Sequence, residues 1–509
     1  MLRSLALAAL LALAGALPAT FSAAQEPPRG RPTEVRQPEG RKLPPDSTTE
    51  HVIELPGRTL RVTATAGALP LTDPNGVVQA EIGYVAYRLA GPDAAARPVT
   101  FAVNGGPGSA SAYLHLLAIG PWRLPLDGST VSPSAPPVLV PNAETWLDFT
   151  DLVFLDPVGT GYSRATGSES EIRDRYYGVE ADVASLSAAI ARWLRVNDRL
   201  ASPKFFMGES YGGFRGPLVA RKLQTELGIG LSGLVLVSPV LDFGYLSQPR
   251  HAPFENVARL PSLAAAHLER RAAATREALA EAERYAAGEY LLDLTRGVGD
   301  REAVERVSRR VAELTGLDPT FVRRRAGRLD MGAFAREFRR EEGREVSIYD
   351  TGVSSFDPDP AGSRGVGGDP LLTAMQAPLT SAIVDHLWRR LGWVVPNQRY
   401  ELSNGSVGGA WRYGRGRRAP DAVDELKEAL ALDPDMRVMV SHGLTDLVTP
   451  YFASELILRQ VPAYGSEPRL ALTTYPGGHM YYTRAGSRAA FRTDGETMYR
   501  RALDSRGRD

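Results

Sequence analysis

The sequence predicts an α/β protein with a mostly parallel, doubly wound sheet. Short apolar runs that are typical of buried strands alternate with longer segments of helical periodicity. Residues 151–155 are predicted to form a strand, residues 179–196 a helix and residues 234–237 a later strand. Because this alternation recurs along the chain, helices are expected to cover both faces of one sheet.

Two strands are expected to open the sheet, at residues 59–66 and 77–89. The sequence Asp-Pro-Asn-Gly at residues 73–76 is a strong turn signal between them. The first part of the core is therefore expected at residues 50–244.

The composition shifts to alanine, arginine, glutamate and leucine between residues 245 and 388. Val304 and Val307 recur at helical spacing, and Gly316 is a typical helix end. We therefore expect a helical cap at residues 245–388, inserted after a core strand, and the second part of the core at residues 389–509. Charges of both signs are interspersed in the cap, which is typical of a solvated face.

The N-terminus has the features of an export signal. Arg3 stands before an almost wholly apolar run at residues 5–17, which is followed by Ser-Ala-Ala. This pattern is typical of a signal peptide at residues 1–24, cleaved near Ala24. The apolar run is shorter than the about 20 residues that a membrane-spanning helix needs. Residues 25–49 are rich in proline, arginine and glutamate and are expected to form a flexible leader. The mature chain is expected to be secreted or periplasmic, in a bacterial setting, without a membrane span.

Composition limits the classes of function. The 509 residues are 43% hydrophobic, and the formal net charge of zero argues against nucleic acid or an anionic membrane as the main partner. The chain has no cysteine, which excludes disulfides and thiolate metal sites. The segment from Asp357 to Asp369 is rich in glycine and proline and lacks the regular oxygen spacing of an EF-hand calcium loop. We expect a globular enzyme without cofactor or metal, and the oligomeric state stays open.

The sequence Gly-Glu-Ser-Tyr-Gly at residues 208–212 stands between a strand-like run at residues 204–207 and a helix-like run at residues 217–223. This is the setting of a nucleophile elbow, in which a tight turn exposes a serine and flanking glycines let chain segments pass closely. Ser210 is the candidate nucleophile. With 50 glycines in 509 residues, such a pentapeptide arises by chance on the order of a few tenths of a time, so other motifs must support it.

A strand-like run at residues 98–103 breaks into Asn-Gly-Gly-Pro-Gly at residues 104–108. Such a loop can present backbone N–H groups to the negative oxygen of an acyl-transfer intermediate, and removing one such donor typically costs about 3 kcal/mol of barrier. We assign the N–H groups of Gly106 and Tyr211 to this oxyanion hole. For the glycine cluster taken alone, a simple tight turn is the alternative explanation.

Two further predicted strands end in polar residues. Residues 436–442 lead into Asp446, and residues 470–475 lead into a glycine turn that carries His479. The order Ser210, Asp446, His479 is that of a triad in the α/β-hydrolase fold, where the histidine takes the serine proton and the aspartate fixes the histidine tautomer. The agreement of three motifs supports the assignment far more strongly than one motif does.

His442 is the alternative base among the seven histidines of the chain. It precedes Asp446 on the same predicted strand end, which breaks the expected order. His479 has its own strand and glycine turn, so it is the preferred base. For Asp446 the alternative is a turn-forming aspartate near Pro450.

Together these motifs resemble the serine carboxypeptidase family. The resemblance spans about residues 80–490, with weak cover between about 245 and 380. It implies an α/β-hydrolase that removes the C-terminal residue of peptides through an acyl-enzyme, with Asn104 and Glu209 binding the terminal carboxylate of the substrate. The matching segments are Asn104–Gly108, Asp156–Ser163, Gly208–Gly212, Asp446 in a Gly-x-x-Asp setting, and Gly478–Met480.

Two positions depart from the family pattern. Ser109 stands where many members have a cysteine, and Ala118 stands where an acidic residue precedes the Gly-Pro pair at residues 120–121. The usual pair of acids is therefore missing. Because a carboxylate beside another carboxylate is tolerated only when one of them is protonated, Glu209 would be a pH-dependent receptor.

The sequence therefore predicts a serine-type carboxypeptidase with a Ser-Asp-His triad and a peptide substrate. An esterase or acyltransferase with the same triad is the main alternative, because the triad fixes acyl transfer and not the acceptor. Prolyl aminopeptidases combine a similar loop and elbow but typically carry histidine at the position of Asn104. A non-catalytic binding protein of the same fold is the last alternative, although such proteins commonly lack a triad residue.

Overall fold

The computed structural model describes residues 40–91, 96–126, 132–247, 249, 251–362, 367–414 and 418–504. The predicted signal peptide and residues 25–39 of the predicted leader lie outside the described residues.

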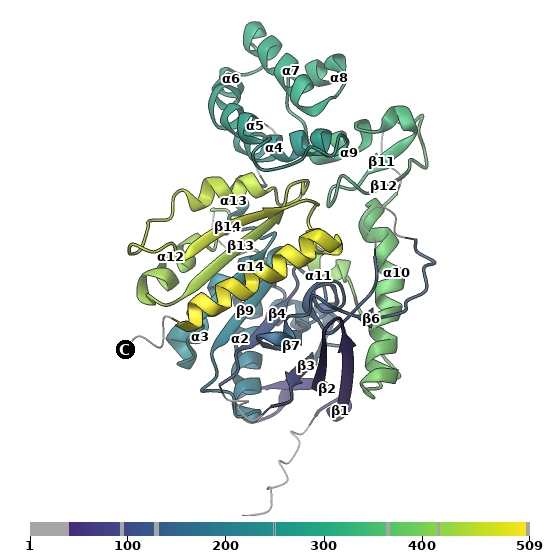
Figure 1. Cartoon of the computed structure of the whole chain (residues 1–509), viewed down its shortest axis with the longest axis vertical. Helices are drawn as coiled ribbons and strands as arrows, with labels where there is room; N and C mark the ends of the chain where they lie inside the picture. Colours follow the sequence, from purple (N-terminus) through teal and green to yellow (C-terminus); the bar gives the residue numbers. More distant parts are fainter. Residues whose placement is uncertain are drawn as a thin grey trace, which may run out of the picture. The chain divides into compact units, whose positions relative to one another are not determined.

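The main sheet contains ten strands in the described part of the chain. They are β1 (Ser47–Leu55), β2 (Arg58–Thr72), β3 (Val78–Leu89), β4 (Val99–Val103), β7 (Asp151–Leu155), β8 (Arg164–Ala165), β9 (Lys204–Glu209), β10 (Gly233–Val237), β13 (Arg437–Gly443) and β14 (Leu470–Tyr475). Their order is β1-β2-β3-β7-β4-β9-β10-β13-β14, and β8 pairs with β3. Neighbours from β7 to β14 are parallel, and those from β1 to β7 are antiparallel. This order confirms the predicted α/β-hydrolase fold class (Figure 1).

The two predicted opening strands are β2 and β3, and the turn between them is closed by the Gly76 N–H, which donates to the Asp73 carbonyl (3.0 Å). The strand β1 is missing from the prediction. Before it, Leu43 is buried and its N–H donates to the carboxylate of Glu81 (3.0 Å). The predicted flexible leader at residues 25–49 therefore extends too far.

Helices cover both faces of the sheet, as predicted (Figure 1). Alternate residues of a strand point to opposite faces, so Phe205 and Met207 of β9 join one core and Phe206 joins the other. The first core contains η1 (Leu114–Ile119), α10 (Pro370–Asp385) and α14 (Ala485–Asp504); the second contains α2 (Val179–Val196), α3 (Tyr211–Leu227) and α12 (Val423–Leu432).

A helical segment follows β10, as the composition predicts. Its helix α7 ends at Gly316 in the left-handed conformation (φ 69°), the predicted helix end. The apolar core of the segment includes Leu444, Tyr451 and Phe452, which follow β13. The cap helices therefore pack on the part of the core that carries Asp446. The elements are α4 (Phe254–Glu269), α5 (Ala280–Tyr285), α6 (Leu291–Arg296), α7 (Arg301–Thr315), α8 (Pro319–Arg324), α9 (Met331–Glu337), β11 (Arg344–Val346) and β12 (Ser354–Phe356); α13 (Tyr451–Leu458), which follows β13, shares their apolar core.

The predicted cap at residues 245–388 extends too far. The helix α10 lies in this range, yet Met375, Leu379 and Ile383 join the same core as the strands. Composition does not distinguish a cap helix from a helix that packs on the sheet, because both have the same apolar residue types on their buried face. Among the described residues, no helix combines the length and the apolar character needed to cross a membrane.

Candidate active site

The strand β9 ends at Glu209 and the helix α3 begins at Tyr211, so Ser210 forms a one-residue turn between them. Its backbone lies at φ 60° and ψ −121°, a conformation that costs a side-chain-bearing residue on the order of 1–3 kcal/mol. A Cβ on Gly208 would lie 1.9 Å from the carbonyl oxygen of Gly212, so only glycine fits there. The turn has the close chain passage expected of a nucleophile elbow.

Ser210 and His479 both form hydrogen bonds with residues at the end of β10. The Ser210 N–H donates to the carbonyl of Val237 (2.8 Å), and the Ser238 hydroxyl donates to the carbonyl of His479 (2.8 Å). Since β9, β10, β13 and β14 are parallel neighbours, their carboxyl ends share one edge of the sheet. The fold thus brings the predicted nucleophile, base and Asp446 to the same edge.

The buried carboxylate of Asp446 is surrounded by donors. Its Oδ1 accepts from the N–H groups of Val448 (2.8 Å) and Thr449 (3.0 Å). Its Oδ2 lies 2.7 Å from Nδ1 of His479 and 2.7 Å from the Thr449 hydroxyl. Because a carboxylate only accepts, Nδ1 of His479 must carry the proton, and Nε2 is left as an acceptor.

The pKa of His479 is raised above its ordinary value. Burial lowers the pKa of this histidine, but the charge and hydrogen bond of Asp446 and the charge of Glu209 outweigh that effect. The ring packs edge-on against Tyr349, with centroids 5.3 Å apart, and the His479 N–H donates to the Tyr349 carbonyl (2.5 Å). These contacts fix the orientation of the imidazole.

The alternative base, His442, is buried and hydrogen-bonded through both ring nitrogens. Its Nδ1 donates to the carbonyl of Thr449 (3.1 Å), and its Nε2 lies 2.9 Å from the Ser454 hydroxyl. Burial lowers the pKa of His442 to about 4. Both ring nitrogens of His442 are engaged, so neither is free to accept a proton from Ser210, and the choice of His479 as the base stays a prediction.

The glycine loop after β4 lies against the elbow. A Cβ on Gly105 would lie 2.6 Å from the amide nitrogen of Tyr211, and Gly106 has φ 100°, a value that suits glycine. Within the described ranges, the N–H groups of Gly106 and Tyr211 have no hydrogen-bond acceptor. Both groups are thus available to bind an oxyanion, and the oxyanion-hole assignment stays a prediction.

Arg215 of α3 links the elbow helix to the glycine loop. Its guanidinium donates to the carbonyl of Asn104 and forms a buried ion pair with Asp182 of α2 (2.6 Å). The sequence analysis missed both residues, because single charges on predicted helices are more often solvated. The pair holds the loop and the two helices together.

Asn104 and Glu209 lie side by side. The Asn104 amide donates from Nδ2 to Oε2 of Glu209 (2.8 Å), and its Oδ1 accepts from the N–H of Leu114 (3.0 Å), which fixes the amide orientation. Burial raises the pKa of Glu209, and the His479 charge and the hydrogen bonds to Glu209 offset only part of the rise. A raised pKa keeps this carboxyl protonated to higher pH, as a receptor for another carboxylate requires.

One residue at this pair was missed by the sequence analysis. Tyr482 lies in η7 (Tyr481–Thr483), and its fully buried hydroxyl donates to Oε2 of Glu209 (2.6 Å). Ala118, at the position of the missing acid, is buried in η1 and has no polar side-chain group. A tyrosine soon after His479 resembles core packing in the sequence, so no local signal marks the contact.

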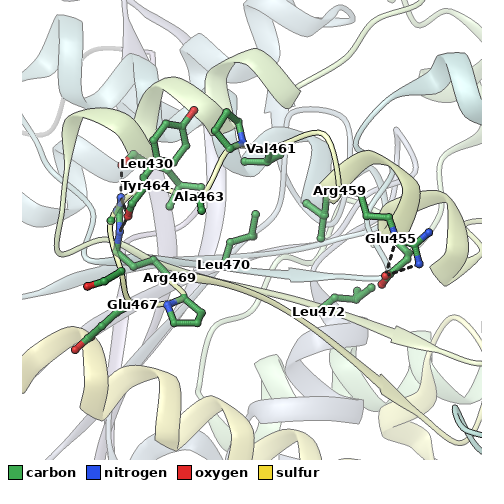
Figure 2. Close-up of a pocket in the computed structure, with 15 residues that line it drawn as sticks. Leu430, Glu455, Arg459, Val461, Ala463, Tyr464, Glu467, Arg469, Leu470 and Leu472 are labelled. Atoms are coloured by element: carbon green, nitrogen blue, oxygen red, sulfur yellow. Dashed lines mark hydrogen bonds and ion pairs between the residues drawn. The ribbon is translucent and has the colours of Figure 1, made fainter.

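A groove of about 400 Å³ lies beside the edge strand β14 (Figure 2). Val461, Leu470 and Leu472 line it, and none of the predicted site residues does. The guanidinium of Arg469 in this groove is held by the carbonyl of Leu430 (2.8 Å). The groove therefore adds nothing to the candidate active site.

The segment from Asp357 to Asp369 has structural contacts. Asp357 pairs with Arg336 (3.1 Å), and Asp369 accepts from the Leu371 N–H (3.0 Å) at the start of α10. In the part of the chain that the structure describes, no group of three or more His, Cys, Asp or Glu side chains is placed to hold a metal ion.

The fold is that of the α/β-hydrolase class. Residues 84–252 match the family model described as serine carboxypeptidase. The match includes the glycine loop and the elbow, and it confirms the predicted resemblance to the serine carboxypeptidase family.

Two curated relatives carry the name pheromone-processing carboxypeptidase KEX1. The protein of Yarrowia lipolytica is 31% identical over 149 residues, which are 29% of this chain and 22% of the relative. That of Komagataella phaffii is 29% identical over 183 residues, which are 35% of this chain and 27% of the relative. The chain thus spans less than a third of the length of these relatives.

Among solved structures, a proline iminopeptidase of Mycobacterium smegmatis is similar over 90% of this chain and 100% of its own, with a TM-score of 0.35 and 14% identity. A likeness at this level adds nothing to the assignment of fold or function.

Proposed function

We propose that the chain is a serine-type carboxypeptidase that hydrolyses the C-terminal peptide bond of its substrate. One observation carries the proposal: Glu209, which directly precedes Ser210, accepts a hydrogen bond from Asn104 (2.8 Å), at the sheet edge that also holds the 2.7 Å contact between His479 and Asp446. An amide and a neutral acid at this place suit a substrate that ends in a free carboxylate. The family match supports the same function.

In the proposed reaction, Nε2 of His479 takes the proton of the Ser210 hydroxyl while Oγ attacks the carbonyl carbon of the scissile bond. The contact between Nδ1 and Asp446 leaves Nε2 as the acceptor that this step needs. The N–H groups of Gly106 and Tyr211 would bind the negative oxygen of the tetrahedral intermediate. His479 then gives its proton to the departing nitrogen as the C–N bond breaks. A water molecule repeats the sequence and releases the acyl group from the serine.

The proposed reaction has two opposed requirements for pH. A peptide carboxylate beside ionised Glu209 is repelled, so binding weakens as pH rises through the raised pKa of Glu209. The base must be neutral, so turnover weakens as pH falls through the raised pKa of His479. Because the two groups interact, they titrate as a pair, and activity is confined to the range between their apparent values.

We also propose that the chain is exported and cleaved near Ala24. Arg3 and the apolar run at residues 5–17 support this location. The mass of the mature chain recovered from the periplasm or the medium tests it, and an intact N-terminus at Met1 would contradict it.

The test of the proposed activity uses one blocked dipeptide with a free or an amidated C-terminus. Wild type should release the terminal amino acid from the free acid, and Ser210→Ala and His479→Ala should each lose on the order of a million-fold in turnover. Ser170→Ala and His251→Ala, which alter exposed residues of the same types, are the matched controls and should keep full activity. Hydrolysis that survives Ser210→Ala would contradict the proposal.

The main alternative is an esterase or acyltransferase with the same triad. Comparing the turnover of the free-acid peptide, the amidated peptide and an ester of the same acyl group distinguishes it from a carboxypeptidase. Faster turnover of forms without a terminal carboxylate would favour that alternative. Labelling by a fluorophosphonate probe in wild type, but not in Ser210→Ala, distinguishes both enzymes from a non-catalytic binding protein.

A further inference from the structure

Two donors converge on one oxygen of Glu209. The Nδ2 of Asn104 lies 2.8 Å from Oε2, and the hydroxyl of Tyr482 lies 2.6 Å from the same atom. All three side chains are buried, with Tyr482 at 0% exposure. An oxygen that already accepts two donated protons is a poorer site for a third proton than the other oxygen of the same carboxyl group. When Glu209 is neutral, its proton therefore resides on Oε1.

We infer that Tyr482 is a positioning residue for substrate recognition: its hydroxyl holds Oε2, so that neutral Glu209 presents its Oε1–H to the terminal carboxylate of a peptide. This inference rests on the proposed carboxypeptidase function. Ala118 leaves Glu209 without an acidic partner, and the tyrosine hydroxyl occupies a partner position without adding a second carboxyl group. Burial raises the pKa of Tyr482 well above its ordinary value, so the hydroxyl remains a donor at every relevant pH.

The other titratable groups that act on Glu209 come from separate elements. His479 follows β14 and lowers the pKa of Glu209 by its charge, whereas Asp446 follows β13 and raises it. Tyr113 precedes η1 and Tyr481 lies in η7, and both interact electrostatically with Glu209. Removing one hydroxyl at position 482 leaves all four groups in place, so their effects are common to the variant and its parent.

The direction of the pH effect follows from the hydrogen bond. The Tyr482 hydroxyl favours ionised Glu209 and thereby lowers the pKa that burial raises. Tyr482→Phe removes this effect, so Glu209 should stay neutral to higher pH. Affinity for a free carboxylate, which is lost as pH rises through this pKa, should persist to higher pH by about one unit, the usual effect of one hydrogen bond to a charged group. At low pH, Tyr482→Phe should bind the peptide with a free C-terminus several-fold more weakly than its parent does. The reason is that Oε2 of Glu209 has lost one of the two donors that fix its position.

The experiment measures the Kd of a blocked dipeptide, with a free or an amidated C-terminus, from acidic to mildly alkaline pH. A Ser210→Ala background separates binding from turnover. Tyr481→Phe is the matched control, because it removes a neighbouring, equally buried hydroxyl that donates to Ser441 (2.7 Å) and not to Glu209. Thermal unfolding of each variant checks that it is folded.

Tyr482→Phe should shift the pH dependence of free-acid binding upward and weaken the low-pH plateau, with no change for the amidated peptide or in Tyr481→Phe. In a Glu209→Gln background, which has no titrating group at this position, adding Tyr482→Phe should leave the pH profile unchanged. Three results with Tyr482→Phe would each overturn the inference about Tyr482 but not the proposed function. These are an unshifted pH dependence of free-acid binding, an unchanged affinity at low pH, or an equal change in the Kd of the amidated peptide. If the Ser210→Ala parent bound the free-acid and the amidated peptide equally at every pH, both the inference and the proposed function would be overturned.

Discussion

Replacing Asp446 by asparagine should disable the proposed base without unfolding the protein. Every group bonded to this carboxylate is a donor: the N–H groups of Val448 and Thr449 at Oδ1, and the Thr449 hydroxyl and Nδ1 of His479 at Oδ2. Asparagine keeps one acceptor oxygen and replaces the other by an NH₂ group that only donates. Because the backbone N–H groups cannot change role, the oxygen should stay with them, and the NH₂ group should face His479.

The imidazole can satisfy that NH₂ group only in its other tautomer. Nδ1 then accepts, Nε2 carries the proton, and Nε2 of His479 can no longer take the proton of Ser210. A change of tautomer in a Ser-His-Asp triad lowers kcat by about 10⁴, which corresponds to about 5 kcal/mol of barrier. We expect a loss of this size in Asp446→Asn, smaller than the loss on removing Ser210 or His479.

The assay for this variant is kcat on the free-acid dipeptide, with thermal unfolding as the check on folding. Thr449→Val is the comparison variant, because it removes a hydroxyl that contacts Oδ2 of Asp446 (2.7 Å) and Nδ1 of His479 (3.1 Å) but keeps the Asp446 carboxylate and its own contact with His479. It should lose at most about tenfold in kcat. A folded Asp446→Asn protein with kcat within about tenfold of wild type would refute the tautomer argument and leave Asp446 a structural residue.

Two further predictions concern the elbow and the core. Gly212→Ala should lower kcat by about a hundredfold or more, because the new Cβ would lie 2.4 Å from the Val103 carbonyl oxygen and displace the glycine loop. Gly405→Ala, where a Cβ meets no atom within 4 Å, is the control, and an active Gly212→Ala would contradict the geometry. Acid should destabilise the fold through His115, whose pKa burial lowers to about 3. Below about pH 6.5 only the unfolded chain binds a proton there, so the free energy of unfolding should fall by up to about 1.4 kcal/mol per pH unit. Urea unfolding at several pH values checks this, and an equal slope in His115→Gln would contradict it.

The centre of the sheet could be predicted because β4, β7 and β10 are short strands that are buried at every position. The edge strand β1 could not, because every second position of it is exposed, and three of these four positions carry polar Thr48, Glu50 and Glu54. The end of the cap could not be predicted either. The buried side chains of α10 are apolar, and only tertiary packing shows that they join the core of the sheet.

The candidate residues with a local signal could be found from the sequence. Ser210 and His479 have glycine neighbours because the backbone passes close to other segments there, and glycine is visible in a sequence. Tyr482 and Arg215 act through contacts with residues far away along the chain, and Tyr482 lies 273 positions from Glu209. Such contacts depend on how the elements pack, which no spacing within one segment encodes.

The partner of Glu209 decides how a carboxylate receptor of this kind would respond to pH. Two acids that share a proton release it at higher pH, because its loss leaves two adjacent negative charges. Glu209 instead faces two neutral donors, from Asn104 and Tyr482, which stabilise its single charge. With Ala118 in place of an acid, neutral Glu209 can still bind the free carboxylate of a peptide. Glu209 ionises at a lower pH than in a pair of acids, however, and therefore repels that carboxylate from a lower pH upward. It follows that Glu209, whose pKa the donors at Oε2 help to lower, would set the upper pH limit for free-acid peptides, while His479 would set the lower limit.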